Sequence, residues 1–199
     1  MMKQHRQYAI LIGSLLMFGS AAFAQEAAET PRFEFSLNYS YLRNNPGGFL
    51  PAYNANGGFG TAQYNFSKSF GVVADLGANY VGTSSGVPFG NTSFEYLFGP
   101  RYTWRHSRIS PYVQTLFGGE RYSSGFDPQS SFPLLGTSQN NFAMAFGGGV
   151  DVTLTNHIAV KPIQVDYLMT QFAPGGGNPI TASNNIRYSA GVVFRFGSK

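Results

Sequence analysis

The sequence contains no cysteine, and charged residues make up only 11% of its 199 positions. The lack of cysteine excludes disulfides and thiolate metal sites, on which small exported domains often depend. A water-soluble domain usually carries about 25% charged residues, so the low charge content indicates a surface that does not mainly meet water. After Ala24 no uninterrupted apolar run reaches the length of a membrane-spanning helix. Amphiphilic β-strands are consistent with both deficits.

The start of the chain has the pattern of a secretory signal peptide. Lys3 and Arg6 precede an apolar run from Tyr8 to Phe18, and the small-residue site Ala22-Phe23-Ala24 follows. The run, at roughly a dozen residues, is too short to span a bilayer as a helix. We expect cleavage between Ala24 and Gln25; a short membrane anchor that stays attached is the alternative.

Three segments follow from this expectation: a signal peptide over 1–24, a short extension over 25–31, and one domain over 32–199. Loss of Lys3 and Arg6 would lower the basic count from 13 to 11 against 9 acidic residues, so the formal net charge falls from +4 to +2. The sequence has no cluster of Lys and Arg interleaved with aromatics, which argues against nucleic acid as a partner.

Apolar and polar residues alternate along the whole chain after residue 32. In the first segment the odd-numbered residues from Phe33 to Tyr41 are aromatic or aliphatic, and the even-numbered residues from Glu34 to Ser40 are polar. A period of two is the mark of a strand with two different faces. The pattern recurs near 57–66, 70–81, 92–105, 109–122, 141–153, 157–171 and 185–196, which predicts eight strands. Pro162 cannot donate a ladder hydrogen bond, so we expect a bulge there and leave the facing of Lys161 open.

The predicted connections alternate in length. Tight turns are centred on Ser67-Lys68-Ser69, His106-Ser107 and Thr155-Asn156, whereas the segments 43–56, 82–91, 123–140 and 172–184 are long and rich in Gly, Pro, Ser and Asn. Short periplasmic turns and long extracellular loops are typical of outer-membrane barrels. We therefore predict an all-β fold, an eight-stranded antiparallel up-and-down transmembrane β-barrel in the cell outer membrane.

Lipid offers no hydrogen bonds, so a sheet that spans the membrane must close and leave no edge. We expect the apolar faces of this closed sheet to meet lipid. Aromatic girdles would mark the two interfaces, one with Phe66, Phe70, Tyr102, Trp104, Phe194 and Phe196, the other with Tyr41, Tyr80, Phe94 and Tyr122. The alternative is a soluble barrel of lipocalin type with its apolar face inward. That barrel would expose a belt of Phe, Tyr and Val to water and would aggregate.

The segments FEYLFGPRYTW, ISPYVQTLFGGE, FAMAFGGGVDV, IQVDYL and IRYSAGVVFRFG resemble the outer-membrane β-barrel domain family, which includes the membrane part of outer-membrane protein A and small eight-stranded relatives. The resemblance covers about Arg32 to Phe196. It implies a structural, host-surface or membrane-integrity role, with barrel insertion machinery and periplasmic chaperones as partners. The peptidoglycan-binding domain of some members is missing here, so a cell-wall tether is not expected. Gly197-Ser198-Lys199 replace the terminal aromatic residue common in this class.

Ionisable residues on the polar face are expected to form a barrel-interior ionic network, because an eight-stranded barrel is narrow and buried charges need partners. A catalytic carboxylate pair or a proton path is the alternative. His106 and His157 fall at turns without a serine and carboxylate beside them or a third metal ligand, so no catalytic, cofactor or metal site is expected. The glycines 147–149 lie within a strand and suit curvature better than phosphate binding. The predicted network comprises Glu34, Asp75, Glu95, Arg101, Glu120, Asp151, Lys161, Asp166, Arg187 and Arg195.

These features predict a non-enzymatic barrel with a plugged interior and a role in envelope structure or surface interaction. A narrow pore or gated channel is one alternative. A surface adhesin acting through the long loops is the other, since recognition tends to reside on loops held by a rigid scaffold.

Overall fold

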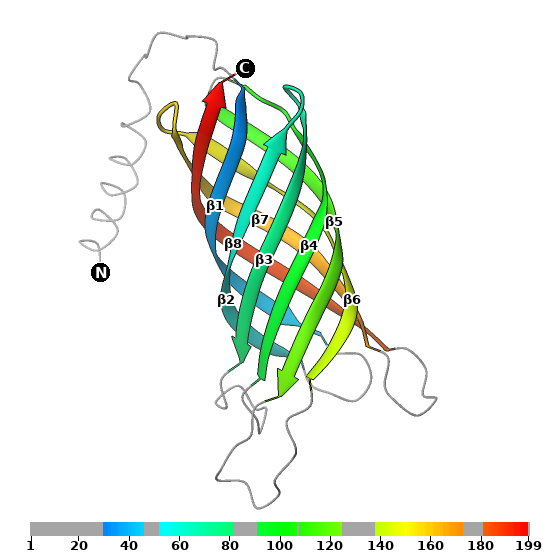
Figure 1. The fold of residues 1–199 in the computed structure, drawn as a ribbon. Helices are drawn as coiled ribbons and strands as arrows, with labels where there is room; N and C mark the ends of the chain where they lie inside the picture. Colours follow the sequence, from blue (N-terminus) through cyan, green and yellow to red (C-terminus); the bar gives the residue numbers. More distant parts are fainter. Residues whose placement is uncertain are drawn as a thin grey trace, which may run out of the picture.

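The computed structural model describes residues 30–45, 52–81, 91–106, 108–124, 138–172 and 181–198. Within these ranges no helix is long and apolar enough to cross a membrane. The described chain forms eight β-strands in sequence order (Figure 1). Their bounds are β1 Pro31–Asn44, β2 Tyr53–Asn65, β3 Phe70–Val81, β4 Asn91–Thr103, β5 Ile109–Ser124, β6 Ser138–Thr153, β7 Ile158–Phe172 and β8 Thr181–Ser198.

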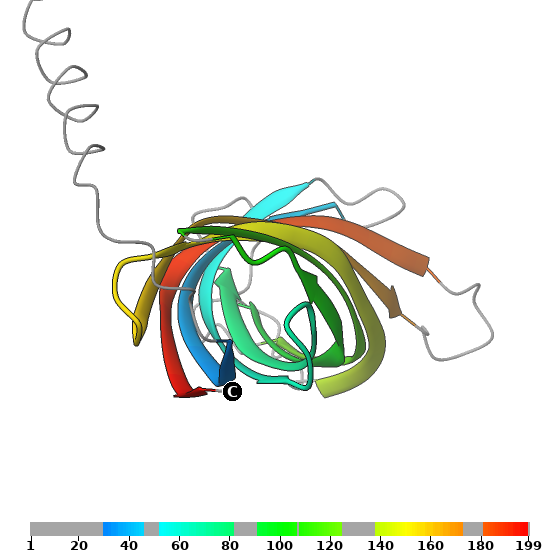
Figure 2. The ribbon, with the colours of Figure 1, turned by 90° about the horizontal axis from the view of Figure 1, so that it is seen from above.

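The strands close into a barrel in which each strand pairs antiparallel with its sequence neighbours. Closure is made by β1, which pairs with β2 on one side and with β8 on the other. Glu34, for example, lies opposite Gln63 of β2 and Arg195 of β8. Seen along its length, the barrel is a continuous ring of tilted strands (Figure 2). The predicted up-and-down antiparallel β-barrel is confirmed.

The two ends of the barrel differ in which connections they carry. We call the end where β1 begins and β8 ends the turn end; residues 66–69, 104–108 and 154–157 join strands there (Figure 1). Two of these connections are closed by backbone hydrogen bonds, from Ser67 N to Phe70 O at 3.2 Å and from Leu154 N to Ile158 O at 3.0 Å. The opposite end, where 45–52, 82–90, 125–137 and 173–180 join strands, is the loop end.

The strands extend further at the loop end than the sequence pattern predicts. The expected loops over 43–56 and 123–140 are wrong at their edges, because Arg43 pairs with Asn54 and Arg121 pairs with Asn140 in the ladder. The expected loop over 172–184 is also too wide, since β8 begins at Thr181. These edges are rich in Asn and Ser, which favour turns in sequence. Strand pairing uses only backbone groups, however, so the ladder continues past the apolar residues.

The predicted irregularity at Pro162 is confirmed. The register between β7 and β8 shifts between Lys161 and Gln164, and that between β6 and β7 shifts between Val150 and Val152. A residue without an N–H cannot complete the ladder, so the strand bulges there. The shift turns Lys161 inward, where only 1% of the side chain is exposed. The facing that the sequence leaves open is thus interior.

The two faces of the strands have opposite polarity to those of a soluble barrel. Large apolar side chains point outward, and Leu37, for example, is 67% exposed. Polar and charged side chains point inward, and Asp75, Glu95 and Asp166 are fully buried. Residues of both predicted aromatic girdles point outward, for example Phe66 and Trp104 of one girdle and Tyr80 and Phe94 of the other. Tyr122 lies on β5, but its side chain is outside the described set.

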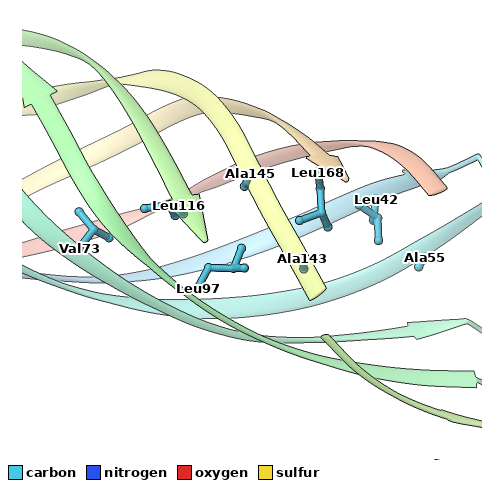
Figure 3. Close-up of a cluster of buried hydrophobic side chains, with 8 residues drawn as sticks. All are labelled: Leu42, Ala55, Val73, Leu97, Leu116, Ala143, Ala145 and Leu168. Atoms are coloured by element: carbon cyan, nitrogen blue, oxygen red, sulfur yellow. The ribbon is translucent and has the colours of Figure 1, made fainter. Parts of the chain in front are cut away.

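The interior is not wholly polar. Eight buried apolar side chains from β1 to β7 point into the barrel (Figure 3). Each interrupts the inward polar series that alternation predicts, and Leu97, for example, stands between Glu95 and Arg101 on the inner face of β4. Apolar packing therefore fills the space between charged groups. The cluster comprises Leu42, Ala55, Val73, Leu97, Leu116, Ala143, Ala145 and Leu168.

Candidate functional site

All ten residues of the predicted ionic network point into the barrel. Each is between 0% and 6% exposed, and together they come from seven of the eight strands. They lie in several groups at different levels along the barrel axis, and side-chain amides connect three of these groups. The ten are Glu34, Asp75, Glu95, Arg101, Glu120, Asp151, Lys161, Asp166, Arg187 and Arg195.

Arg187 of β8 is the centre of the largest ionic group. Its Nη1 lies 3.0 Å from Glu95 Oε2, and its Nη2 lies 3.0 Å from Asp75 Oδ2 and 2.9 Å from Asp166 Oδ2. The guanidinium also stacks over the Phe59 ring, 4.3 Å from the centroid. Because β8 is not adjacent to β3 or β4, which carry Asp75 and Glu95, Arg187 spans the barrel interior.

A second ionic group lies near the turn end around Glu34. Arg195 Nε donates to Glu34 Oε1 at 2.9 Å, and Arg105 Nη2 donates to Glu34 Oε2 at 2.9 Å. The sequence pattern missed Arg105, because it lies in the β4–β5 connection and reaches Glu34 across a separation of 71 residues. No local spacing signals such a contact.

A third group holds two cations against one aromatic ring. The Arg101 guanidinium lies 4.2 Å from the centroid of the Tyr112 ring, and Lys161 Nζ lies 5.4 Å from it. The other partners of Arg101 are amides: its Nη1 donates to Gln63 Oε1, and its Nη2 donates to Gln114 Oε1, both at 2.6 Å. The aromatic face and the amide oxygens supply the negative potential that would otherwise come from carboxylates.

Amide side chains join these three groups into one network. Gln114 Nε2 donates to Asp166 Oδ1 at 3.0 Å, and Asn65 Nδ2 donates to Glu34 Oε2 at 3.0 Å. The connected chain of hydrogen bonds runs through Glu34, Asn65, Gln63, Arg101, Gln114, Asp166, Arg187, Glu95, Asn79 and finally Ser40. Its ends lie six positions apart on β1, so it follows the barrel axis.

The remaining two carboxylates, Glu120 and Asp151, form no ion pair within the described ranges. Glu120 Oε2 accepts a hydrogen bond from Thr170 Oγ1 at 2.7 Å. Asp151 is 3% exposed near the turn end, and its Oδ1 is among the described buried atoms without a hydrogen-bond partner. Glu120 lies directly opposite Glu95 of the Arg187 group in the β4–β5 ladder, and its pairing with a cation stays a prediction.

Glycines on the inner face make room for the stacked rings. A Cβ at Gly77 would lie 2.8 Å from Phe59 Cβ, and a Cβ at Gly149 would lie 2.6 Å from the Tyr112 hydroxyl oxygen. Real Cβ atoms do not approach so closely. The glycine run 147–149, expected to serve curvature, therefore also leaves space for the ring that carries Arg101 and Lys161.

The interior chemistry is that of charge pairing. No three His, Asp or Glu side chains within the described ranges come together as a metal site would need. His106 and His157 lie exposed in turn-end connections, as the sequence predicts. The proposed cleavage site at Ala24 and Gln25 lies outside the described residues.

Comparisons with known proteins agree with this architecture. The family model described as the outer membrane protein β-barrel domain matches residues 10–196. No curated protein sequence matches the chain. Among solved structures, Neisserial surface protein A superposes with a TM-score of 0.63 at 14% identity, covering 82% of this chain and 97% of that one.

Two further solved barrels share the fold. Ail, the attachment invasion locus protein of Yersinia pestis in complex with the heparin analogue sucrose octasulfate, superposes with a TM-score of 0.56 at 17% identity, covering 82% of this chain and 97% of that one. The outer membrane protein OprG from Pseudomonas aeruginosa superposes with a TM-score of 0.54 at 14% identity, covering 87% of this chain and 100% of that one. At these identities the likeness shows the fold alone.

Proposed function

This chain belongs to the outer membrane protein β-barrel domain family, and on that premise we propose that it is a non-enzymatic barrel with a sealed interior that serves envelope structure or surface interaction. The observation that carries the proposal is the inverted polarity of the closed sheet. Outward residues such as Leu37 and Phe98 are 67% and 54% exposed, while every described carboxylate is buried. Water would not stabilise that outer surface, whereas hydrocarbon would.

The orientation in the membrane is part of the proposal. Outer-membrane barrels place short turns in the periplasm and longer loops outside. We assign the turn end to the periplasm, because β1 begins and β8 ends there and a chain exported across the inner membrane arrives from that side. The loop end would then face the exterior, where any surface ligand would bind.

Sealing is supported by contacts that cross the barrel. Arg187 reaches from β8 to Asp75 of β3 and Glu95 of β4, so direct hydrogen bonds occupy the middle of the interior. An isolated buried charge is costly, and three carboxylates on one guanidinium resist opening because each would lose its partner. These contacts favour a plug over the pore.

A proton path is also disfavoured by the groups that form the network. Its links pass through the guanidinium groups of Arg101 and Arg187 and through the amides of Gln63 and Gln114. Arginine does not release its proton in proteins, and an amide does not relay one. A carboxylate pair acting as acid and base would need contact with substrate or water, whereas Asp75, Glu95 and Asp166 are fully buried.

Planar-bilayer recording tests the sealed interior. Purified chain inserted into the bilayer should give no steady current, and Arg187→Ala should introduce current because it removes the cross-barrel contact. Arg43→Ala, at an exposed position of β1, is the matched control and should stay silent. Steady, ion-selective current from the unaltered chain, lost in Arg187→Ala or Arg101→Ala, would establish the channel alternative instead.

A further inference from the structure

Charge of opposite sign is divided between the two faces of the barrel. All six carboxylates of the described residues, Glu34, Asp75, Glu95, Glu120, Asp151 and Asp166, are buried. The exposed charged side chains of the described residues are all cationic, namely Arg32, Arg43, Lys68, Arg108 and Arg121. The outer surface of the described strands and turns is therefore positive.

Three of the five exposed cations of the described residues lie at the turn end. Arg32 is the second residue of β1, Lys68 lies in the β2–β3 turn, and Arg108 lies in the β4–β5 connection. We call these three residues the cationic collar. The β6–β7 connection carries the exposed His157 in place of a Lys or Arg. The collar therefore covers the β1-to-β5 side of the turn end.

The buried carboxylate two residues from Arg32 on β1 is already paired with cations. Glu34 is bound by both Arg105 and Arg195. Arg105 Nε in addition donates to the Lys68 carbonyl oxygen at 3.0 Å, which ties the β4–β5 connection to the β2–β3 turn. This contact keeps Lys68 beside the residues that follow β4.

A run of aromatic rings lies directly against the collar on the outer surface. Phe66 stacks on Phe70 at 6.3 Å, Phe70 contacts Tyr102 at 4.8 Å, and Tyr102 contacts Trp104 at 4.7 Å between centroids. Arg32 lies over the neighbouring Tyr64 ring, 5.6 Å from its centroid. Amphipathic rings of this kind locate at the headgroup level of a bilayer. The collar thus stands at the depth of the lipid headgroups.

We propose that the cationic collar binds the headgroups of anionic phospholipids in the leaflet at the turn end. The inference rests on the proposed function, since it needs the outward apolar face to lie in a bilayer. Cations held at the headgroup level attract anionic lipid by charge, and salt screens the attraction. The absence of exposed carboxylates in the described residues means that no surface anion of this part competes for Arg32 and Lys68.

The single tryptophan of the sequence provides the measurement. Trp104 is 43% exposed and adjacent in sequence to Arg105, which contacts Lys68. The full chain is refolded into phosphatidylcholine vesicles containing equal mole fractions of nitroxide-headgroup phosphatidylglycerol or nitroxide-headgroup phosphatidylcholine. From the quenching of Trp104 we expect the labelled phosphatidylglycerol to associate roughly fivefold more strongly than the labelled phosphatidylcholine, which corresponds to about 1 kcal/mol. The preference should shrink in high salt.

Matched variants localise the effect. Arg32→Gln/Lys68→Gln should bring the lipid preference close to one, while Arg43→Gln/Arg121→Gln, with the same charge change at the loop end, should leave it intact. Equal quenching by the two lipids in the unaltered chain would overturn the collar. A second measurement, with lipids brominated on the acyl chain, distinguishes a failure of the collar from a failure of the proposed function. If these lipids quench Trp104, the barrel is in the bilayer and only the collar is wrong; without such quenching, the proposed function itself fails.

Discussion

The inner and outer faces of the same eight strands are specified in different ways. On β4, Phe98 points outward with 54% exposure, and its neighbour Leu97 is fully buried inside. The outer residue needs only to be apolar, because hydrocarbon accepts any such side chain. An inner residue must fit particular partners, as Arg187 fits Asp75, Glu95 and Asp166. The outer face is thus defined by its solvent, and the inner face by its contacts.

The largest difference between the faces should appear when the central cation is removed. Arg187→Met leaves three buried carboxylates without their guanidinium, which should lower the free energy of unfolding by about 3–5 kcal/mol. Arg43→Met removes an exposed arginine that donates to Asn54 and should cost less than about 1 kcal/mol. Urea unfolding of the lipid-embedded chain, followed by Trp104 fluorescence, measures both. Coincident unfolding curves for the two variants would contradict the contact-defined interior.

Placing a charge on the outer face should give the next largest effect. Leu76→Arg, midway along β3 with 50% exposure, should destabilise the lipid-embedded barrel by about 2–4 kcal/mol. Leu76→Ala keeps the position apolar and serves as control, with a smaller loss expected from the reduced apolar area. The same urea titration applies. If the arginine variant were as stable as the alanine variant, the outer face would not be in hydrocarbon.

Two glycines on opposite faces give the smallest but cleanest comparison. A Cβ at Gly77 would lie 2.8 Å from Phe59 Cβ, whereas a Cβ at Gly60 would have its nearest neighbours at 3.7 Å and 3.8 Å. Gly77→Ala should therefore cost about 1–3 kcal/mol by overpacking, and Gly60→Ala should change stability by less than about 0.5 kcal/mol. The temperature at which each variant loses its fast-migrating folded form on a gel ranks the two variants by stability. A reversed ranking would refute the role of Gly77 in seating Phe59.

Alternation alone predicts most of the fold, for a physical reason. Strand residues face opposite sides in turn, so a barrel between hydrocarbon and a polar interior requires the pattern seen from Phe33 to Tyr41. The irregularity at Pro162 is equally local, because it follows from a missing N–H. Strand ends at the loop end are harder to predict, since the Asn-rich edges pair through backbone groups without any apolar signal.

The partners inside the barrel could not be predicted from spacing. Glu34 meets Arg195 across 161 residues and Arg105 across 71, and only barrel closure and register bring these side chains together. The apolar interior layer was missed as well, because Leu97 and Leu116 replace polar residues in otherwise regular strands. Which residues face the interior is therefore decided locally by the alternation, whereas which of them contact one another is decided by the closed fold.

Nitroxide labelling at single cysteines tests the inverted polarity most directly, because the chain has no cysteine of its own. Labels at Leu37→Cys and Phe98→Cys in lipid vesicles should be relaxed strongly by dissolved oxygen and weakly by a water-soluble nickel complex. A label at Asn156→Cys, in the exposed β6–β7 connection, should show the opposite preference. Strong relaxation by nickel at positions 37 and 98, equal to that at 156, would place the outer face in water and contradict the account.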